Sequence, residues 1–490
     1  MSRDRRAARD PGPADVIAGA LTDWRPALGE LVWWTPDDED AARAAGVVSE
    51  VGPSFLQRDH LLSAHARRAS GGPHRAVVTV TTEVDEPLDD GAMARALTDF
   101  TRTHDELRSR FVVDDSGVIT RLLTPPEIIA VRTRREPAPP DHAALVDVLH
   151  RRIDRDATHD RIPGWSVGAV DAGSSFALHV TFDHSHTDGS AAIEALQEIV
   201  VRYRAHVTGT EPVLRPAGSH LDHVTDELRR AATVTPDDPL VRRWRDVLVA
   251  HGRTVPRTAL DIGLDGPDPA PAVAIDEPLV DATTAAACES RARSAGGSLS
   301  AALFAAIARA QWHVTGEPRY FTSTVLSTRD PAFPGTQGWM CTFAPIALQA
   351  DAGEPDDLVR GAAEQLRHAR AHIDRPVHGV LAVLAASGDF VPDASSPQMV
   401  SYLDFRKLAD PRAPEIVAGR VMPGVGRTRN ANLWINRNDD GLRLLSHVPD
   451  NAVARRSIAA LHASLVAELT SYARVQRPVR YAEHVGAQVP

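Results

Sequence analysis

The feature that most constrains the fold of this chain is a strand that runs into a helix through residues 183–189, Asp-His-Ser-His-Thr-Asp-Gly. Residues 175–182 alternate between large apolar and smaller side chains, which is the two-residue period of a half-buried strand. Apolar residues then recur at helical spacing over 193–203, and Ser190 is placed to cap the first turn. The sequence therefore predicts a strand–turn–helix unit with His184 at its junction.

This junction suits acid–base chemistry. A helix N-terminus carries free N–H groups and a partial positive charge, which favour an anion. His184 would stand at the end of a rigid strand facing that helix, where a general base could act beside a developing oxyanion. Gly189 lacks a Cβ, so its N–H could approach the oxyanion, although a glycine required only by the turn explains it equally well. The spacing predicts a reaction class and leaves the substrate open.

Length and composition exclude several classes of protein. At 490 residues the chain is too long for one small core, so two domains or lobes are expected. A net charge of −11 leaves no basic face for a nucleic acid. No apolar run approaches the roughly 20 residues of a membrane span. The two cysteines, Cys288 and Cys341, are too few for a disulfide framework, so the cytoplasm is the expected compartment.

The two halves of the chain carry similar patterns. Strand and helix signals alternate in each, and residues 84–90 resemble residues 275–281, which gives weak support for a duplicated lobe. Stretches rich in proline and aspartate at 234–239 and 263–271 mark the expected junction. We therefore predict a mixed α/β fold of two lobes. The predicted divisions are a disordered leader at 1–13, an N-terminal lobe at 14–230, a linker region at 231–271, a C-terminal lobe at 272–475 and a tail at 476–490.

Five segments resemble motifs of the condensation domains of nonribosomal peptide synthetases, within the chloramphenicol-acetyltransferase-like acyltransferases. The segments depart from the family patterns in places: Thr103 stands for an arginine, Asp183 for the first histidine of the H-H-x-x-x-D-G motif, and Thr342 for an asparagine. In chain order the segments are Ser54-Phe-Leu-Gln57 for S-x-x-Q, residues 103–111 for R-H-E-x-L-R-x-R-F, residues 183–189 for H-H-x-x-x-D-G, residues 324–330 for a strand ending in arginine, and residues 338–345 for G-x-F-x-N-T-x-P.

The resemblance implies a condensation enzyme whose two lobes form a V-shaped pseudo-dimer. Because no adenylation or carrier signature flanks these segments, a free-standing enzyme is expected. The resemblance also implies that His184 is catalytic, positions the acceptor and takes its proton, and that Gly189 donates to the oxyanion. It makes Asp188 a structural partner of Arg329 across the lobe junction. From charge alone, Asp183 would raise the pKa of the neighbouring His184.

Late strands are expected to line a substrate tunnel between the lobes. Strands are predicted at 398–405 and 430–437, and they carry Tyr402, Trp434 and Asn436. An aromatic face or an amide would suit a tunnel wall. Since most aromatic side chains on strands belong to the core, a core position is the favoured reading of each.

No metal and no intrinsic cofactor are expected. His184 and His186 would share a face if the strand continued, yet no further ligand cluster accompanies them. The resemblance implies instead an acyl thioester on the phosphopantetheine arm of a carrier protein as donor, and a small amine or alcohol as acceptor. Two alternatives stay open: an acyltransferase that uses coenzyme A, and a catalytically silent relative that recruits partners. Asp183 keeps the second open, while the intact His184, Asp188 and Gly189 argue against it.

Overall fold

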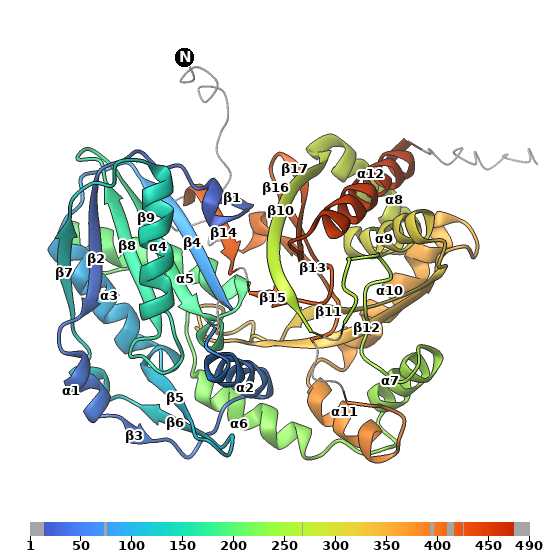
Figure 1. The fold of residues 1–490 in the computed structure, drawn as a ribbon, viewed down its shortest axis with the longest axis horizontal. Helices are drawn as coiled ribbons and strands as arrows, with labels where there is room; N and C mark the ends of the chain where they lie inside the picture. Colours follow the sequence, from blue (N-terminus) through green and yellow to red (C-terminus); the bar gives the residue numbers. More distant parts are fainter. Residues whose placement is uncertain are drawn as a thin grey trace, which may run out of the picture.

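The protein is described by a computed structural model over residues 14–72, 76–266, 268–392, 396–408, 416–424 and 426–474. The leader predicted at 1–13 and the tail predicted at 476–490 lie outside these residues. The described chain forms two lobes side by side, each built on a seven-stranded sheet covered by helices (Figure 1). The predicted mixed α/β fold of two lobes is confirmed.

The first sheet has β9 (Phe176–Asp183) at its centre, between two antiparallel neighbours. Helices α3 (Asp90–Thr103) and α5 (Gly189–Thr208) pack on one face of this sheet, and α4 (His142–Asp156) packs on the other. In spatial order the strands are β1 (Ala14–Ala18), β14 (Ile416–Pro423), β4 (Val77–Val84), β9 (Phe176–Asp183), β8 (Trp165–Asp171), β2 (Glu30–Pro36) and β7 (Val131–Glu136).

The strand β9 is buried along its whole length. Helices cover both faces of the sheet here, so the large residues pack against α3 and α5 while the smaller ones face α4. The prediction of a half-buried strand is therefore wrong in its burial, although the strand itself is where the alternation placed it. A central strand of this kind gives the residues that follow it a rigid origin.

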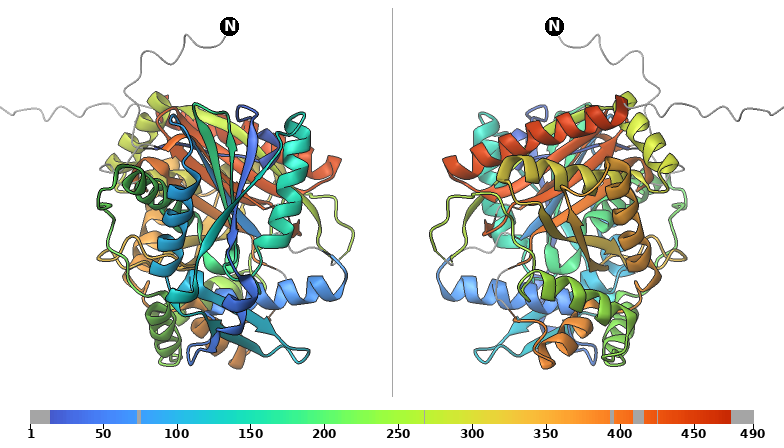
Figure 2. Two further views of the ribbon diagram at one scale, coloured as in Figure 1. Left: turned by 90° about the vertical axis from the view of Figure 1, so that its left-hand side faces the viewer. Right: turned by 90° about the vertical axis from the view of Figure 1, so that its right-hand side faces the viewer.

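The second sheet is covered on its outer face by α8 (Ala282–Ser294), α9 (Leu299–Thr315), α10 (Pro355–Ala371) and α12 (Ala452–Arg474). Figure 2 shows α12 and α9 lying across this face. In spatial order its strands are β12 (Cys341–Gln349), β11 (Arg319–Ser327), β13 (Met399–Asp404), β16 (Asn432–Asn438), β17 (Gly441–Pro449), β10 (Ala270–Asp281) and β15 (Arg427–Thr428).

The internal echo at 84–90 and 275–281 does not mark equivalent structures. In the first lobe β4 ends at Val84 and a loop leads to α3. In the second lobe the matching residues continue β10 to Asp281, paired with β17. The echo is therefore no support for a duplicated lobe.

One strand crosses the predicted division of the chain. The strand β14 belongs to the C-terminal half in sequence, yet it lies in the first sheet, parallel to β1 and antiparallel to β4. A C-terminal lobe continuous over 272–475 does not account for it. The predicted linker region at 231–271 contains α7 (Pro239–Ala250), whose buried Trp244 packs with α11 (Val377–Ala386).

Smaller elements lie beneath the first lobe and the junction of the lobes (Figure 1). The helices α2 and α6 reach across this region, and a three-stranded sheet flanks them. These elements are α1 (Glu39–Ala44), α2 (Phe55–Ala69), α6 (His220–Ala231), β3 (Val47–Val48), β6 (Ile119–Leu123) and β5 (Ser109–Val113).

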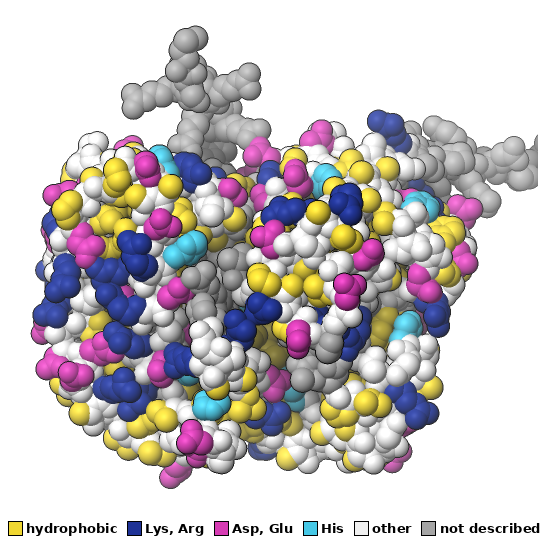
Figure 3. Space-filling view, in the orientation of Figure 1, with side chains coloured by type: hydrophobic (Ala, Val, Ile, Leu, Met, Phe, Trp, Pro, Cys, Tyr) yellow, Lys and Arg dark blue, Asp and Glu magenta, His cyan; other side chains and the backbone are white. Residues whose placement is uncertain are grey.

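The surface and the helix lengths add two observations. Acidic and basic side chains are mixed over the face shown in Figure 3. Among the helices of the described residues, none combines the length and the apolar character that crossing a bilayer would require.

Candidate active site

His184 lies where β9 ends and a short 3-10 turn, His184–His186, leads toward α5. Its backbone N–H donates to the carbonyl oxygen of Ala76 at 3.0 Å, which continues the pairing of β9 with β4. The turn separates the side chains of His184 and His186, so they do not share a face as a continuing strand would require. The imidazole of His184 is left at the junction of the two lobes.

Asp188 caps α5 and also joins the two lobes. Its Oδ1 accepts the N–H groups of Ser190 at 3.0 Å and Ala191 at 2.8 Å, so Asp188 is the N-cap in place of the predicted Ser190. Its Oδ2 accepts from both terminal nitrogens of Arg329 at 3.4 Å and from the N–H of Met340 at 3.0 Å. The structure therefore brings together the two residues that the resemblance paired.

The surroundings of His184 favour its neutral form. The residue is half-buried as a whole, and its ring lies against the indole of Trp339, with 4.0 Å between centroids and 37° between planes. Its pKa is lowered, because desolvation and then the charge of His60 outweigh a backbone hydrogen bond and the carboxylates of Asp188 and Asp183. Asp183 acts in the predicted direction, but the predicted net rise in this pKa is wrong, because desolvation outweighs it. A neutral imidazole is what a general base requires.

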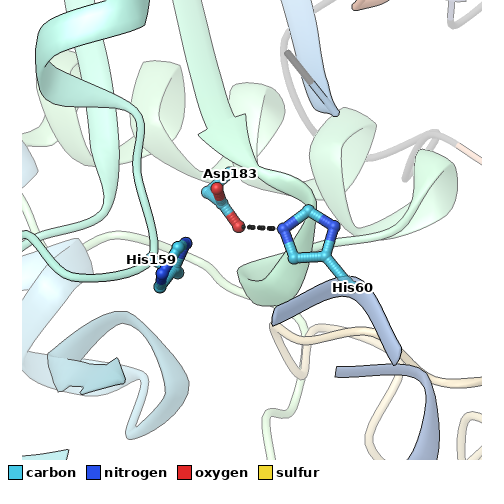
Figure 4. Close-up of side chains that lie close together, drawn as sticks. All are labelled: His60, His159 and Asp183. Atoms are coloured by element: carbon cyan, nitrogen blue, oxygen red, sulfur yellow. Dashed lines mark hydrogen bonds and ion pairs between the residues drawn. The ribbon is translucent and has the colours of Figure 1, made fainter. Parts of the chain in front are cut away.

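Asp183 forms a buried pair with His60 of α2 (Figure 4). Its Oδ1 accepts from His60 Nε2 at 2.8 Å and from the N–H and Oγ of Ser185 at 2.9 and 2.6 Å. Burial alone would raise the pKa of Asp183, but the interaction with His60 holds it well below its usual range. The hydrogen bonds that Oδ1 of the Asp183 carboxylate accepts thus come from His60 and Ser185.

His159 completes the cluster of Figure 4 with an imidazole near the same carboxylate. One potential ligand atom from each of His60, His159 and Asp183 lies within 4.8 Å of the others, and the three residues are buried. In the arrangement observed, Asp183 Oδ1 already accepts three hydrogen bonds. The geometry is that of a hydrogen-bonded carboxylate–imidazole pair with a second imidazole beside it.

A buried carboxylate, Glu106, holds the motif from below. It accepts from Gln57 Nε2 at 2.8 Å, His186 Nδ1 at 3.0 Å, Arg121 at 2.6 Å and His220 Nδ1 at 2.7 Å. Burial would raise the pKa of Glu106, but Arg121 and His220 together hold it well below its usual range. His186 therefore belongs to a supporting network, which explains the second histidine without a metal.

The helix α2 is fixed to the motif through Gln57. Ser54 and Gln57 form a capping box at the start of α2, and Gln57 Nε2 also donates to the carbonyl oxygen of Ser185 at 2.7 Å. The segments 54–57 and 103–111, which only the family resemblance singled out, thus meet under the H-x-x-x-D-G turn. Nothing in the local pattern of either segment predicted the hydrogen bond between Gln57 of the first and Glu106 of the second.

Gly189 is the first residue of α5, and the fold itself does not require a glycine there. Its φ is not in the left-handed region, and a methyl group at this position would meet only Leu403, at 3.6 Å. The cap by Asp188 engages the N–H groups of Ser190 and Ala191 and not that of Gly189. The N–H of Gly189 at the N-terminus of α5 is therefore not used by the Asp188 cap, and there is space beside it.

The three predicted tunnel residues lie on two different faces of the second sheet. Tyr402 packs against the core of the second lobe. Leu403, the next residue on β13, packs instead with the first-lobe core and faces Gly189. Asn436 is the register partner of Leu403, and Trp434 is the partner of Ser401 on the same face. Trp434 and Asn436 therefore face the first lobe, and Tyr402 does not.

Several curated proteins are similar in sequence, and no protein-family model matches the chain. PapA1 of Mycobacterium tuberculosis, a 2'-acyl-2-O-sulfo-trehalose (hydroxy)phthioceranyltransferase, is 31% identical over 69% of this chain and 65% of its own length. The chain thus spans just under two thirds of PapA1. The acyltransferase PapA3 of the same species is 26% identical over 93% of this chain and 96% of its own length.

Two solved structures place the fold. A PapA2 acyl transferase superposes with a TM-score of 0.84 at 23% identity, covering 94% of this chain and all of that chain. The first condensation domain of the CDA synthetase superposes with a TM-score of 0.62 at 18% identity, covering 88% of this chain and 97% of that domain. The chain has the fold of condensation domains. The condensation fold confirms the resemblance drawn from the five sequence segments.

Proposed function

We propose that this protein is an acyltransferase that moves an acyl group from a thioester to a small acceptor, with His184 as general base. The observation that carries the proposal is a desolvated His184 of lowered pKa beside the N-terminus of α5. The named sequence relatives are acyltransferases, which supports the same reaction class.

The chemistry follows from the junction. The neutral imidazole of His184 takes the proton of the acceptor as its oxygen or nitrogen attacks the thioester carbonyl. The tetrahedral oxyanion that forms is stabilised by the N–H of Gly189 and the positive end of the α5 dipole. The C–S bond then breaks, and the leaving thiolate takes the proton from the imidazolium. Positioning both substrates at His184 contributes up to about 7–11 kcal/mol.

An alcohol is the favoured acceptor, which makes the product an ester. The printed names of PapA1 and of the trehalose-2-sulfate acyltransferase PapA2 describe acyl transfer to sulfated trehalose, whose free groups are hydroxyls. The favoured donor is a thioester on the phosphopantetheine arm of a carrier protein, as in condensation enzymes. A starter condensation domain of similar fold was solved with C8-CoA, so coenzyme A thioesters are the second donor to test.

A mass-spectrometric transfer assay tests this function. Wild type, His184→Ala and His206→Ala would each receive carrier-protein thioesters or acyl-coenzyme A with mixed alcohol and amine acceptors. His206 is a matched control, because it lies on α5 but pairs with Asp99 away from the junction. We expect ester from wild type and His206→Ala, and a loss of about a hundredfold or more in His184→Ala. Equal turnover by His184→Ala would remove the proposal.

A further inference from the structure

Three aromatic rings meet at the lobe junction and form what we name the ring cluster: His60, His184 and Trp339. The His184 and Trp339 rings pack with their centroids 4.0 Å apart. The edge of the His60 ring meets Trp339 at 6.1 Å and 85°, and its centroid lies 6.5 Å from that of His184. Each ring centroid therefore lies within 6.5 Å of the other two.

The cluster draws its members from three separate parts of the chain. His60 comes from α2, His184 from the turn after β9, and Trp339 from the loop between β11 and β12 of the second lobe. Each side is anchored. Asp183 holds His60, whose side chain is only 4% exposed, and Asp188 holds the N–H of Met340 next to Trp339. The cluster thus spans the lobe junction at the reactive imidazole.

A catalytic histidine needs something that fixes its ring. The usual device is a carboxylate bonded to the second ring nitrogen, which sets the orientation of the imidazole. Here both neighbouring carboxylates are engaged elsewhere. Asp183 bonds His60 and Ser185, and Asp188 caps α5 and binds Arg329. The orientation of His184 must therefore come from contacts other than a carboxylate.

We propose that Trp339 and His60 are positioning residues that clamp the imidazole of His184, with Asp183 as the anchor of His60. This inference rests on the proposed role of His184. It gives Asp183 a function that its place in the motif does not suggest. An aspartate at this position supports catalysis through the ring cluster, where a histidine would leave His60 without its carboxylate partner.

The first test needs no substrate. Histidine-selective NMR of the full-length protein, with His184 assigned from His184→Ala, reports the ring current of an indole packed against the imidazole. We expect the carbon-bound protons of His184 to resonate upfield in wild type. They should return toward ordinary positions in Trp339→Leu and shift partly in His60→Gln. Unchanged His184 resonances in both variants would overturn the proposal, whatever acyl group the enzyme transfers.

The second test separates positioning from substrate binding. Trp339→Leu and His60→Gln should lower kcat by about ten- to a hundredfold with little change in KM, because small displacements of a reacting group have effects of this size. Trp339→Phe should recover much of the loss, since it keeps an aromatic ring. Equal loss in Trp339→Phe and Trp339→Leu, or an effect on KM alone, would contradict a clamp.

Matched controls guard against general damage. Phe333→Leu removes an aromatic ring from the same loop, where Phe333 is 44% exposed, and His65→Gln changes another histidine of α2. Both should leave kcat unchanged. Thermal unfolding midpoints of all variants identify any that fail to fold. If His60→Gln fails to fold, Asp183→Asn replaces it as the probe of the contact between Asp183 and His60. If wild type transfers no acyl group but the ring-current shift is present, the clamp stands and the proposed reaction fails.

Discussion

At the scale of the residue, the charge state of His184 is set by what surrounds it and not by its neighbour in sequence. The imidazole is desolvated, and its pKa lies below the ordinary value of 6.5. A base with a lowered pKa stays neutral to lower pH. We therefore expect the acid limb of kcat/KM to fall below pH 6.5. A pH–rate profile measures it, and a limb above that value would show that His184 is not the titrating base.

Gly189 offers a second prediction at this scale. Because a methyl group there would meet only Leu403 at 3.6 Å, Gly189→Ala should fold with unchanged stability. The methyl group would occupy the space at the oxyanion donor. We expect kcat/KM to fall by at least about tenfold, or about 1.4 kcal/mol.

The control for this variant is Gly361→Ala, within α10, where a methyl group would meet Leu348 at 3.8 Å. It should leave steady-state kinetics and unfolding unchanged. Full activity in Gly189→Ala would assign Gly189 to the turn alone.

At the scale of the element, Glu106 joins α2, β6, α6 and the turn after β9 through one carboxylate. The Glu106→Gln substitution would leave the fully buried Arg121 without its counter-charge. We expect a loss of about 3–5 kcal/mol in the free energy of unfolding, measured by denaturant titration. The exposed Glu277→Gln on β10 is the control. Equal stability of the two variants would mean that Glu106 is not needed as a charge.

Local pattern predicted the elements well and their partners poorly. Alternation placed β9, and helical spacing placed α5, because both signals lie within one segment. The partner of Asp183 is His60, 123 residues earlier, and no local pattern connects them. The charge of Asp183 does raise the pKa of His184, as predicted, but desolvation and His60, which no local pattern shows, outweigh it. Likewise, only three-dimensional pairing shows that Leu403 faces Gly189.

At the scale of the whole molecule, three buried histidines and one half-buried histidine make the fold sensitive to acid. Burial lowers the pKa of His159, His223 and His447 to about 4, and that of His179 to about 3. Between pH 6.5 and about 4 the unfolded chain therefore binds protons that the folded chain does not. Stability should fall as the pH falls through this window, by about 1.36 kcal/mol per pH unit for each such histidine.

Denaturant unfolding at several pH values between about 7 and about 5 measures this slope. The carboxyl groups of Asp183 and Glu106 cannot produce it, because their pKa values are held well below their usual range and they titrate at lower pH. A flat free energy of unfolding over the window would show that these histidines are protonated in the folded protein.

The position of β14 also governs how the molecule can be made and how it can move. The first sheet receives this strand from residues 416–423, and among the described strands β1 pairs only with β14. A nascent chain that has completed residues 14–230 still lacks the strand that covers the edge of β4. The first lobe can finish folding only after most of the second has been synthesised. In the folded protein, β14 also links the C-terminal half of the chain to the first sheet, so it limits how far the two lobes can separate.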